Sequence, residues 1–278
     1  MKIIIVPTDF SPVAINAMNY AVDMAQQIDA TIMLLHVYQI PVTYNNSDIP
    51  LPFMDVGELE RINKERLEDL KKEVEHISAG DLKIVVEVRL GELVDELKTI
   101  CIDSRPFAVV MGTKGAGFVE RLLVGSSTLS AMKHLPCPVL VIPPGANFKG
   151  IQKMGLASDF KKGLQSIPAG FIKDWVKMFG AVLSVVHVDD DKKPGTAVPV
   201  EPDVSSQALL AELSPQYVVI ENPDVESAIQ EFAETNNLDL LIVMPRKHRL
   251  LDSLFQKSHT KELAFHSHIP ILSIHEDE

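Results

Sequence analysis

The chain has little cysteine and no cysteine cluster. Its 278 residues include two cysteines, Cys101 and Cys137, which are isolated and form no Cys-x-x-Cys motif. This pattern predicts neither a disulfide framework nor a thiolate metal site. We expect two buried, reduced thiols in a cytosolic protein.

Basic charge and long apolar runs are also scarce. The chain has 26 Lys and Arg against 38 Asp and Glu, a formal net charge of -12. A general nucleic-acid binder needs a basic face, so that class is disfavoured. No window approaches the 18 uncharged apolar residues of a membrane span, and the amino-terminal apolar run is interrupted at Pro7 and Asp9. We expect a cytoplasmic protein that binds neither nucleic acid nor a membrane.

What the chain does contain is an internal repeat. The segments 2–11, 31–38 and 82–142 recur as 152–161, 181–189 and 214–274, the last at a constant offset of 132 without a gap. The two halves also carry the same net charge. Periodicity stops in the Pro- and Gly-rich segment 143–150. The sequence therefore predicts two similar domains, residues 1–145 and 150–278.

Short β-branched runs alternate with amphipathic stretches in each half. In the first half the expected strands are 2–6, 31–38, 82–90, 107–111 and 138–142, and the expected helices are 13–28, 57–77 and 92–103. This alternation predicts an α/β fold with a parallel sheet covered on both faces. Residues 39–55 and 189–203 are long for such connections and are either flaps over the sheet edge or surface loops.

Glycines and hydroxyl residues gather where the first and fourth strands end. Gly112 and Gly115 are free to take positive φ and to form an anion-binding nest, and Gly125 allows close approach. After Gly125 come three hydroxyl residues at the start of a helix: Ser126, Ser127 and Thr128. A phosphate chain fits between two such donor sets. In the alternative reading, the glycines mark turns and the hydroxyls cap the helix.

The common phosphate-binding motifs are absent. No Gly-x4-Gly-Lys-[Ser/Thr] occurs, and a dinucleotide loop beginning at Gly115 would have Glu120 in place of its third glycine. A P-loop NTPase and an NAD-dependent dehydrogenase are therefore disfavoured. The pattern that fits is Gly-x2-Gly-x9-Gly-[Ser/Thr], completed by Gly112, Gly115, Gly125 and Ser126.

Three further features accompany this motif: the Pro-x-Asp-Phe-Ser of residues 7–11, the His-Val of the second strand and the closing Pro-Cys-Pro-Val-Leu-Val-Ile. Taken together, they make the chain resemble the universal stress protein family, specifically its tandem members. The resemblance covers both halves. It implies two Rossmann-like (adenine nucleotide alpha hydrolase-like) domains, each with a five-stranded parallel sheet flanked by helices. It also implies ATP binding where the glycine motif is complete, and it suggests that the last strands, 139–142 and 271–274, meet as an intramolecular pseudo-dimer.

The resemblance also implies the ATP-binding residues. Pro7 and Thr8 would shape the adenine wall, Asp9 would face adenine and ribose, and the backbone of Val37 would meet the adenine. The ribose and phosphates would contact these residues: Met111, Gly112, Lys114, Gly115, Gly125, Ser126, Ser127 and Thr128. A Mg or Mn ion bridging the phosphates fits, although no carboxylate cluster forms a protein cage.

Other polar residues have weaker claims to a functional role. Asp9 could instead cap the first helix near Ser11, and His36 and His187 lie in apolar strands, which favours structural roles. No catalytic triad repeats between the halves, so we expect little or no hydrolysis. Two hypotheses remain: an ATP-binding regulatory module with an unidentified protein partner, or a stress scaffold that holds no nucleotide. The chain could also form a homodimer.

The second half lacks the glycine motif. The offset of 132 aligns the motif with non-glycine residues. Gly112, Thr113, Gly115 and Gly125 correspond to Met244, Pro245, Lys247 and Lys257, and only Ser126 keeps its type, as Ser258. Proline removes a backbone donor, and Met and Lys do not adopt the left-handed conformation freely. We expect no nucleotide site there. The loop Arg246–Arg249 is basic and is either a solvated loop or an anion-docking site.

Overall fold

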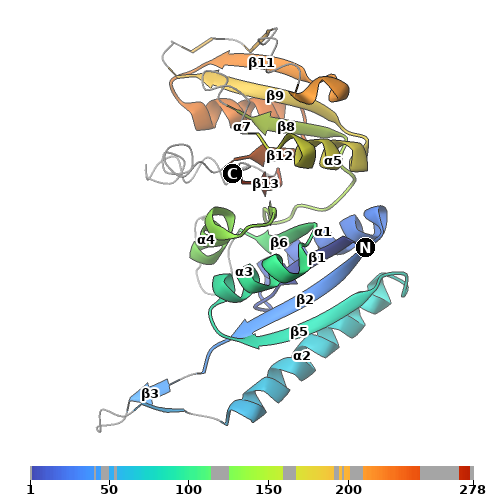
Figure 1. The fold of residues 1–278 in the computed structure, drawn as a ribbon, viewed down its shortest axis with the longest axis vertical. Helices are drawn as coiled ribbons and strands as arrows, with labels where there is room; N and C mark the ends of the chain where they lie inside the picture. The colour runs from blue at the N-terminus through green and yellow to red at the C-terminus, as the bar shows by residue number, and fades with distance from the viewer. Residues whose placement is uncertain are drawn as a thin grey trace.

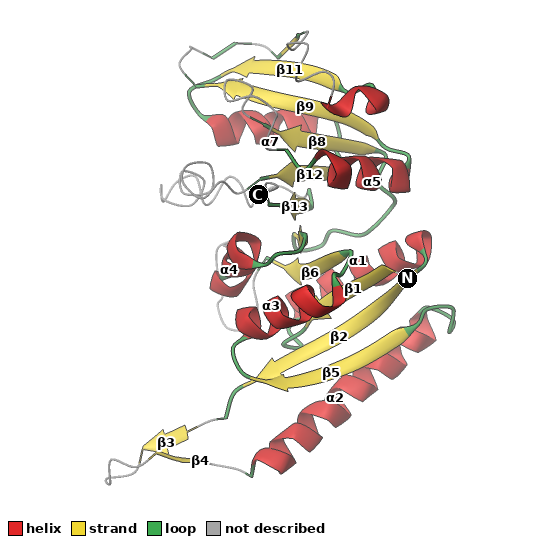
Figure 2. Ribbon diagram, in the orientation of Figure 1, coloured by secondary structure: helices red, strands yellow, loops and turns green. Residues whose placement is uncertain are grey.

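The computed structural model has an α/β architecture with a mostly parallel sheet (Figures 1 and 2). It describes residues 2–40, 42–44, 50–52, 55–113, 125–158, 167–190, 194–195, 197–200, 209–244 and 269–275. Within these ranges, no helix is long and apolar enough to cross a membrane.

The first half contributes five parallel strands in the order β7-β6-β1-β2-β5. These strands are β1 (Lys2–Pro7), β2 (Ala30–Tyr38), β5 (Ile84–Leu90), β6 (Ala108–Gly112) and β7 (Val139–Ile142). Each overlaps the strand expected from the sequence. The buried side chains alternate between the two faces, because Ile4 and Val6 pack in one apolar cluster and Ile5 packs in the other.

Two helices cover each face of this part of the sheet. They are α1 (Pro12–Ile28) and α2 (Val56–Ile77) on one face, and α3 (Leu93–Ser104) and α4 (Ser126–His134) on the other. Local sequence sets where the first two begin. Ser11 caps α1 by accepting a hydrogen bond from the Ala14 amide, and Asp55 caps α2. Asp29, in the left-handed conformation, ends α1.

The second half repeats this arrangement. Its elements include β8 (Lys153–Ala157), α5 (Ala169–Phe179), β9 (Val182–Asp189), the 3-10 helix η2 (Ala211–Leu213), β11 (Gln216–Glu221), α7 (Val225–Thr235), β12 (Leu240–Val243) and β13 (Ile271–Ser273). The helix α7 and the strands β11, β12 and β13 begin 132 residues after α3, β5, β6 and β7. The offset read from the sequence is therefore confirmed in three dimensions.

The two long connections contain short strands. In the first, β3 (Val42–Tyr44) and β4 (Pro50–Pro52) pair antiparallel and project away from the body of the first half (Figure 1). In the second, β10 (Val198–Pro199) pairs antiparallel with β11 at the edge of the sheet. Neither the flap nor the surface-loop interpretation of these stretches had included strands.

A single 11-stranded sheet runs through both halves, in the order β10-β11-β9-β8-β12-β13-β7-β6-β1-β2-β5. The halves join through antiparallel pairing of β13 with β7, in which Ile271 lies opposite Val141 and Ser273 opposite Val139. The expectation that the two last strands meet is confirmed. The expected five-stranded parallel sheet is confirmed in the first half, and the antiparallel pairs in the whole sheet are this junction and the edge pair of β10 with β11.

Aromatic side chains fill the space between the halves beside this strand pair. Trp175 of α5 is fully buried and stacks on Phe107 of the first half, with ring centroids 4.6 Å apart. Phe148, in the connecting segment, packs edge-on against Tyr20 of α1 at 5.2 Å and against Phe179 of α5 at 6.4 Å. Burial raises the pKa of the Tyr20 hydroxyl, so Tyr20 stays neutral at this junction. The junction is thus packed like a core.

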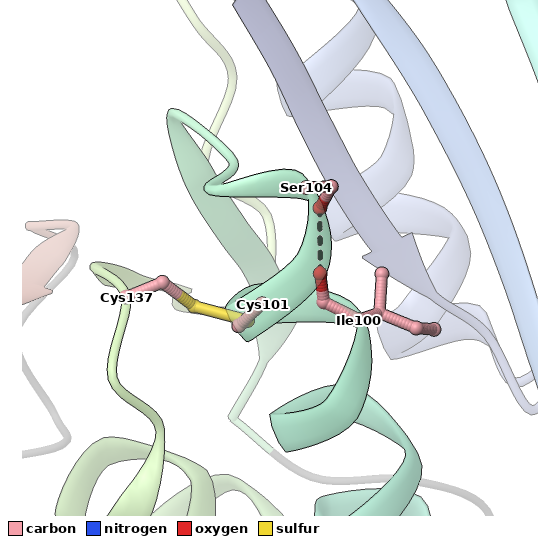
Figure 3. The surroundings of a disulfide bond; sticks show 4 residues. All are labelled: Ile100, Cys101, Ser104 and Cys137. Carbon is pink, nitrogen blue, oxygen red and sulfur yellow. Dashed lines mark hydrogen bonds between the residues drawn. A yellow bond between two sulfur atoms is a disulfide. The ribbon is translucent and has the colours of Figure 1, made fainter.

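A disulfide joins Cys101 of α3 to Cys137, which lies between α4 and β7 (Figure 3). The expectation of two reduced thiols is therefore wrong in this structure, although the expected burial of both residues is confirmed. The cysteines are 36 residues apart in sequence, and the pairing arises because α3 and α4 pack together on one face of the sheet. Within α3, the Ser104 hydroxyl donates a hydrogen bond to the Ile100 carbonyl.

The aromatic junction predicts a large effect of removing Trp175. Because this side chain is fully buried, Trp175→Ala is expected to lower the free energy of unfolding by about 3–5 kcal/mol. Urea denaturation followed by circular dichroism measures this change. Met178→Ala, in the same helix at a residue that is 36% exposed, is the matched control and is expected to cost less than about 1 kcal/mol. Equal costs for the two variants would contradict the role of the junction.

Candidate functional site

The candidate site lies where the strand order of the first half reverses. β1 has β2 on one side and β6 on the other, so the chain leaves β1 toward β2 and later returns to β1's far side. In open parallel sheets, such a reversal leaves a crevice beyond the carboxyl ends of the two central strands. The ends of β1 and β6, at Pro7 and Gly112, border this position.

The turn after β1 is held by hydrogen bonds from its own side chains. The Asp9 carboxylate accepts from the Ser11 amide at 3.0 Å, and the Thr8 hydroxyl accepts from the Phe10 amide at 3.0 Å. The Thr8 amide donates to the Leu35 carbonyl of β2 at 2.8 Å. Phe10 has a positive φ of 63°, which this bonding stabilises. Ser11 is the N-cap of α1, so Asp9 braces the turn before the helix and does not cap it.

Two histidines have equivalent structural roles in the two halves. His36 Nδ1 lies 2.8 Å from the Thr8 carbonyl oxygen, and His187 Nδ1 lies 3.3 Å from the Ser158 carbonyl oxygen. A carbonyl oxygen only accepts, so Nδ1 is the donor in both bonds. Each histidine ties the second strand of its half to the end of the first. The structural reading of both histidines is confirmed.

Gly112 lies against the start of α1. A Cβ atom built on Gly112 would lie 2.5 Å from Val13 Cγ1 and 2.8 Å from the Val13 carbonyl oxygen. Both distances are too short for a side chain. Gly112 was expected to be free to take a positive φ, but it does not adopt one in the structure. What requires glycine here is the close approach of β6 to α1.

The amino end of α4 is attached to the end of β6. The Thr128 hydroxyl donates to the Gly112 carbonyl at 3.0 Å, and the Gly125 amide donates to the Thr113 carbonyl. Thr128 is buried and faces β6, so its hydroxyl does not cap α4. Ser126 and Ser127 are exposed, and the N-cap Gly125 provides no side-chain cap. The first turn of α4 thus faces outward beside β6.

Most of the predicted site residues therefore gather around one point. The end of β1, the end of β6 and the start of α4 bring together Pro7, Thr8, Asp9, Met111, Gly112, Gly125, Ser126, Ser127 and Thr128. Val37 lies near the end of β2, one strand further along. The side chains of Pro7 and Met111 are buried, which leaves their backbone at the site. Lys114 and Gly115 lie outside the described residues.

The backbone of Val37 points to the β1 side of β2. Pairing of β1 with β2 ends at Pro7 and Leu35, whereas β2 runs on to Tyr38. The Leu35 carbonyl accepts from Thr8 on the β1 side, and the Tyr38 carbonyl accepts from Gly91 on the β5 side. Backbone groups alternate sides along a strand, so those of Val37 face the β1 side, beyond the end of the paired register.

An ion-pair cluster beside Val37 was missed by sequence reasoning. Arg89 of β5 lies in register with Val37, and its guanidinium contacts the Glu87 carboxylate at 2.5 Å and the Glu96 carboxylate of α3 at 3.4 Å. The hydrogen bond to Glu87 raises the pKa of Arg89 above its usual range. The three side chains form a polar wall next to β2. Alternation along β5 could have placed Arg89 and Glu87 on one face, but not Glu96 against them.

The corresponding place in the second half differs. Met244, which replaces Gly112 at the offset of 132, is buried in the apolar core. Ser158 takes the place of Thr8. The residues Pro245, Lys247, Lys257 and Ser258 and the loop Arg246–Arg249 lie outside the described residues. In the parts of the chain that the structure describes, no group of three His, Cys, Asp or Glu side chains is placed to hold a metal ion.

The packing at Gly112 predicts a stability effect independent of any ligand. Gly112→Ala is expected to destabilise the protein by about 1–3 kcal/mol, because the added methyl group meets Val13. Val13→Ala in the same chain removes the Cγ1 contact but leaves the carbonyl oxygen, so it is expected to restore part of the loss. Urea denaturation of both single variants and the double variant measures this coupling. Strictly additive costs would contradict the contact.

Comparison with known proteins supports the fold and the repeat. The family model described as "Universal stress protein family" matches residues 1–143 and 157–275. A universal stress protein of Methanocaldococcus jannaschii is 31% identical over 143 residues, covering 51% of this chain and 81% of that protein. One from Thermus aquaticus is 26% identical over 141 residues, covering 51% of this chain and 98% of that protein. Each of these two matches covers about half of this chain.

A solved structure matches both halves together. The crystal structure of a universal stress protein from Archaeoglobus fulgidus superposes with a TM-score of 0.69 at 18% identity, covering 99% of this chain and 97% of that chain. At this identity, the likeness shows a shared fold. The family model matches the chain twice, over most of its length, and the resemblance read from the sequence is confirmed. The chain belongs to the universal stress protein family.

Proposed function

We propose that the first half binds ATP or another adenine nucleotide and acts as a regulatory or signalling module in a stress response. One observation carries the proposal. The Thr128 hydroxyl bond to Gly112 fixes the outward-facing start of α4 beside the end of β6, at the reversal of strand order. This arrangement supports the proposal, because the start of α4 lies beside the residues to which the glycine motif assigns the phosphates.

The phosphate end of the site combines three features. The amino end of α4 carries partial positive charge from the helix dipole. Ser126 and Ser127 present exposed hydroxyls, and Gly125 leaves the approach without a side chain. Lys114 and Gly115 belong to the proposed set by their place in the motif. A Mg or Mn ion bridging the phosphates would complete the charge balance, since Lys114 is the one cation in the set.

The adenine end lies between β1 and β2. The β1-facing backbone of Val37 offers a donor and an acceptor to the base. Asp9 is exposed in a braced turn and would face adenine and ribose, with Pro7 and Thr8 forming the wall behind it. The Asp9 carboxylate accepts the Ser11 amide, which fixes its position. We assign no general base to the site and expect little or no hydrolysis.

For the second half we propose a structural or regulatory role without a nucleotide. Met244 takes the sequence position of Gly112 and is buried in the apolar core, where its side chain replaces the bare backbone of a glycine. We assign the domains to residues 1–145 and 150–278, the second with a degenerate site. We further propose a cytoplasmic location and an unidentified protein partner. The scaffold alternative has one supporting observation: contact with Val13 accounts for Gly112 without any ligand.

Calorimetry of the full, nucleotide-stripped chain with ATP and Mg distinguishes these possibilities. We expect binding with a stoichiometry of about one ATP per chain, because one half carries the motif. Gly125→Val is expected to weaken binding by at least about tenfold, since the side chain obstructs charge-assisted bonds to the start of α4. The Gly125 backbone is extended, with φ −63° and ψ 149°, so valine fits its conformation.

Gly170→Val is the matched control. An added Cβ at Gly170, near the start of α5 in the second half, meets no atom within 4 Å. This variant is expected to bind ATP as the wild type does. Absence of heat at millimolar ATP would favour the scaffold. A stoichiometry of two would show that the second half has kept a site.

A further inference from the structure

We propose that Cys101 and Cys137 form a redox modification site, which exchanges with low-molecular-weight disulfides and dithiols and whose state sets how firmly α4 is held. The proposal rests on the proposed function, because α4 supplies the start of the phosphate site. The chemical class of the reactant is a glutathione-like disulfide for oxidation and a dithiol for reduction. The consequence is a nucleotide affinity that depends on the thiol state.

The disulfide connects the two helices on one face of the first half. Cys101 lies in the third turn of α3, and Cys137 lies three residues beyond the end of α4 (Figure 3). Around them, Leu97, Met132 and Leu135 from both sides of the link pack in the same apolar cluster. A covalent bond here limits how far the carboxyl end of α4 can move from α3.

Hydrogen bonds connect the rest of α4 to both halves. At its start, the Thr128 hydroxyl donates to Gly112. Near its end, the Ser273 hydroxyl of β13 donates to the Met132 carbonyl at 3.2 Å in a buried bond. The helix has only nine residues, so a restraint at one end is transmitted to the other end as a rigid-body constraint. A change at Cys137 therefore bears on Gly125 and Ser126.

The second half provides an internal comparison without sulfur. At the offset of 132, Cys101 corresponds to Ala233 and Cys137 to Ile269. Ala233 is buried, and Ile269 packs against the apolar cluster that contains it. The fold therefore fills this position with an aliphatic pair in the half that lacks the glycine motif. The disulfide thus belongs to the half that has the motif, and the second half shows that an aliphatic pair fills the same position without it.

The surroundings of Cys137 favour thiol–disulfide exchange over a permanent structural disulfide. Cys137 lies between Pro136, which is exposed, and Pro138, which is partly exposed, in a short connection outside any helix or strand. Cys101 is more deeply buried, within a helix. Disulfides in reducing compartments are usually transient or regulatory. In the cytoplasmic location proposed above, this pair would cycle between its two states.

Thiol–disulfide exchange needs no reactant other than the dithiol or the glutathione disulfide. In reduction, a thiolate of the dithiol attacks the Cys137 sulfur and forms a mixed disulfide, and Cys101 leaves as a thiolate and takes up a proton. The second thiol of the reagent then attacks the mixed disulfide, which releases Cys137 and oxidises the dithiol to its cyclic disulfide. In oxidation, one glutathione disulfide accepts both electrons and leaves as two glutathione thiols.

The direction of the effect follows from preorganisation. With the disulfide closed, the start of α4 is held in the geometry that accepts phosphate, so less ordering is required on binding. We expect oxidised wild-type protein to bind ATP about three- to tenfold more tightly than reduced protein. Calorimetry after equilibration with glutathione disulfide or dithiothreitol measures this ratio. Thiol titration of the denatured protein counts the free cysteines in each state.

Two variants separate the redox effect from packing. Cys101→Ser with Cys137→Ser is expected to bind as the reduced wild type does under both conditions. Cys101→Ala with Cys137→Ile copies the aliphatic pair of the second half, keeps the cluster apolar and is also expected to lose redox dependence. Ser104→Ala removes the hydroxyl bond to Ile100 in the same helix but leaves both cysteines, so it is expected to keep the wild-type ratio.

A readout without nucleotide distinguishes failure of this inference from failure of the proposed function. Amide hydrogen exchange across residues 126–134 is expected to be slower in the oxidised protein than in the reduced protein. If this difference is present and neither form binds ATP, the redox site holds and the proposed ATP function fails. Equal exchange and equal ATP affinity in the two states would overturn the inference, as would two free thiols after treatment with glutathione disulfide.

Discussion

Antiparallel pairing of β7 with β13 is the constraint on which the whole arrangement depends. Each half would otherwise end in an exposed strand, and exposed edges promote association with other chains. The pairing turns two sheets into one and directs α1 of the first half and α5 of the second toward the aromatic junction around Trp175. It also places Ser273 within reach of α4. The strand pair, the junction and the candidate site are thus parts of one connected structure.

Much of the fold could be predicted because the spacing of apolar residues along the chain indicates its strands and helices. The apolar runs placed β1, β2, β5, β6 and β7 to within about two residues, since buried parallel strands have a simple pattern. The pairing partner of β7 came from family resemblance, because the residues of a strand do not specify which other strand it pairs with. The hairpin of β3 and β4 was not predicted, since its Pro- and Asn-rich sequence resembles a loop.

The described residues of the candidate site lie together as the sequence predicted, but their individual contacts differ from those expected. Gly112 was expected to offer backbone freedom, whereas the structure shows that glycine is needed there for close contact with Val13 of another element. Thr128 was assigned to a helix cap, whereas its hydroxyl binds β6. The disulfide was not predicted, because cysteines 36 residues apart without a motif give no signal of proximity. Each miss concerns a contact between elements, which local pattern does not encode.

The strands at the two ends of the sheet have a consequence for polymerisation. In the part of the chain that the structure describes, the outermost strands are β5 and β10. β5 carries Arg89 and Glu87, already paired with each other, and β10 has two residues, one of them Pro199, which has no amide hydrogen to donate. Both ends therefore disfavour the addition of another strand, and the last strands of the two halves, β7 and β13, already pair with each other within the chain. Among the described residues, both edges of the sheet therefore carry features that disfavour growth of a filament by addition of further strands.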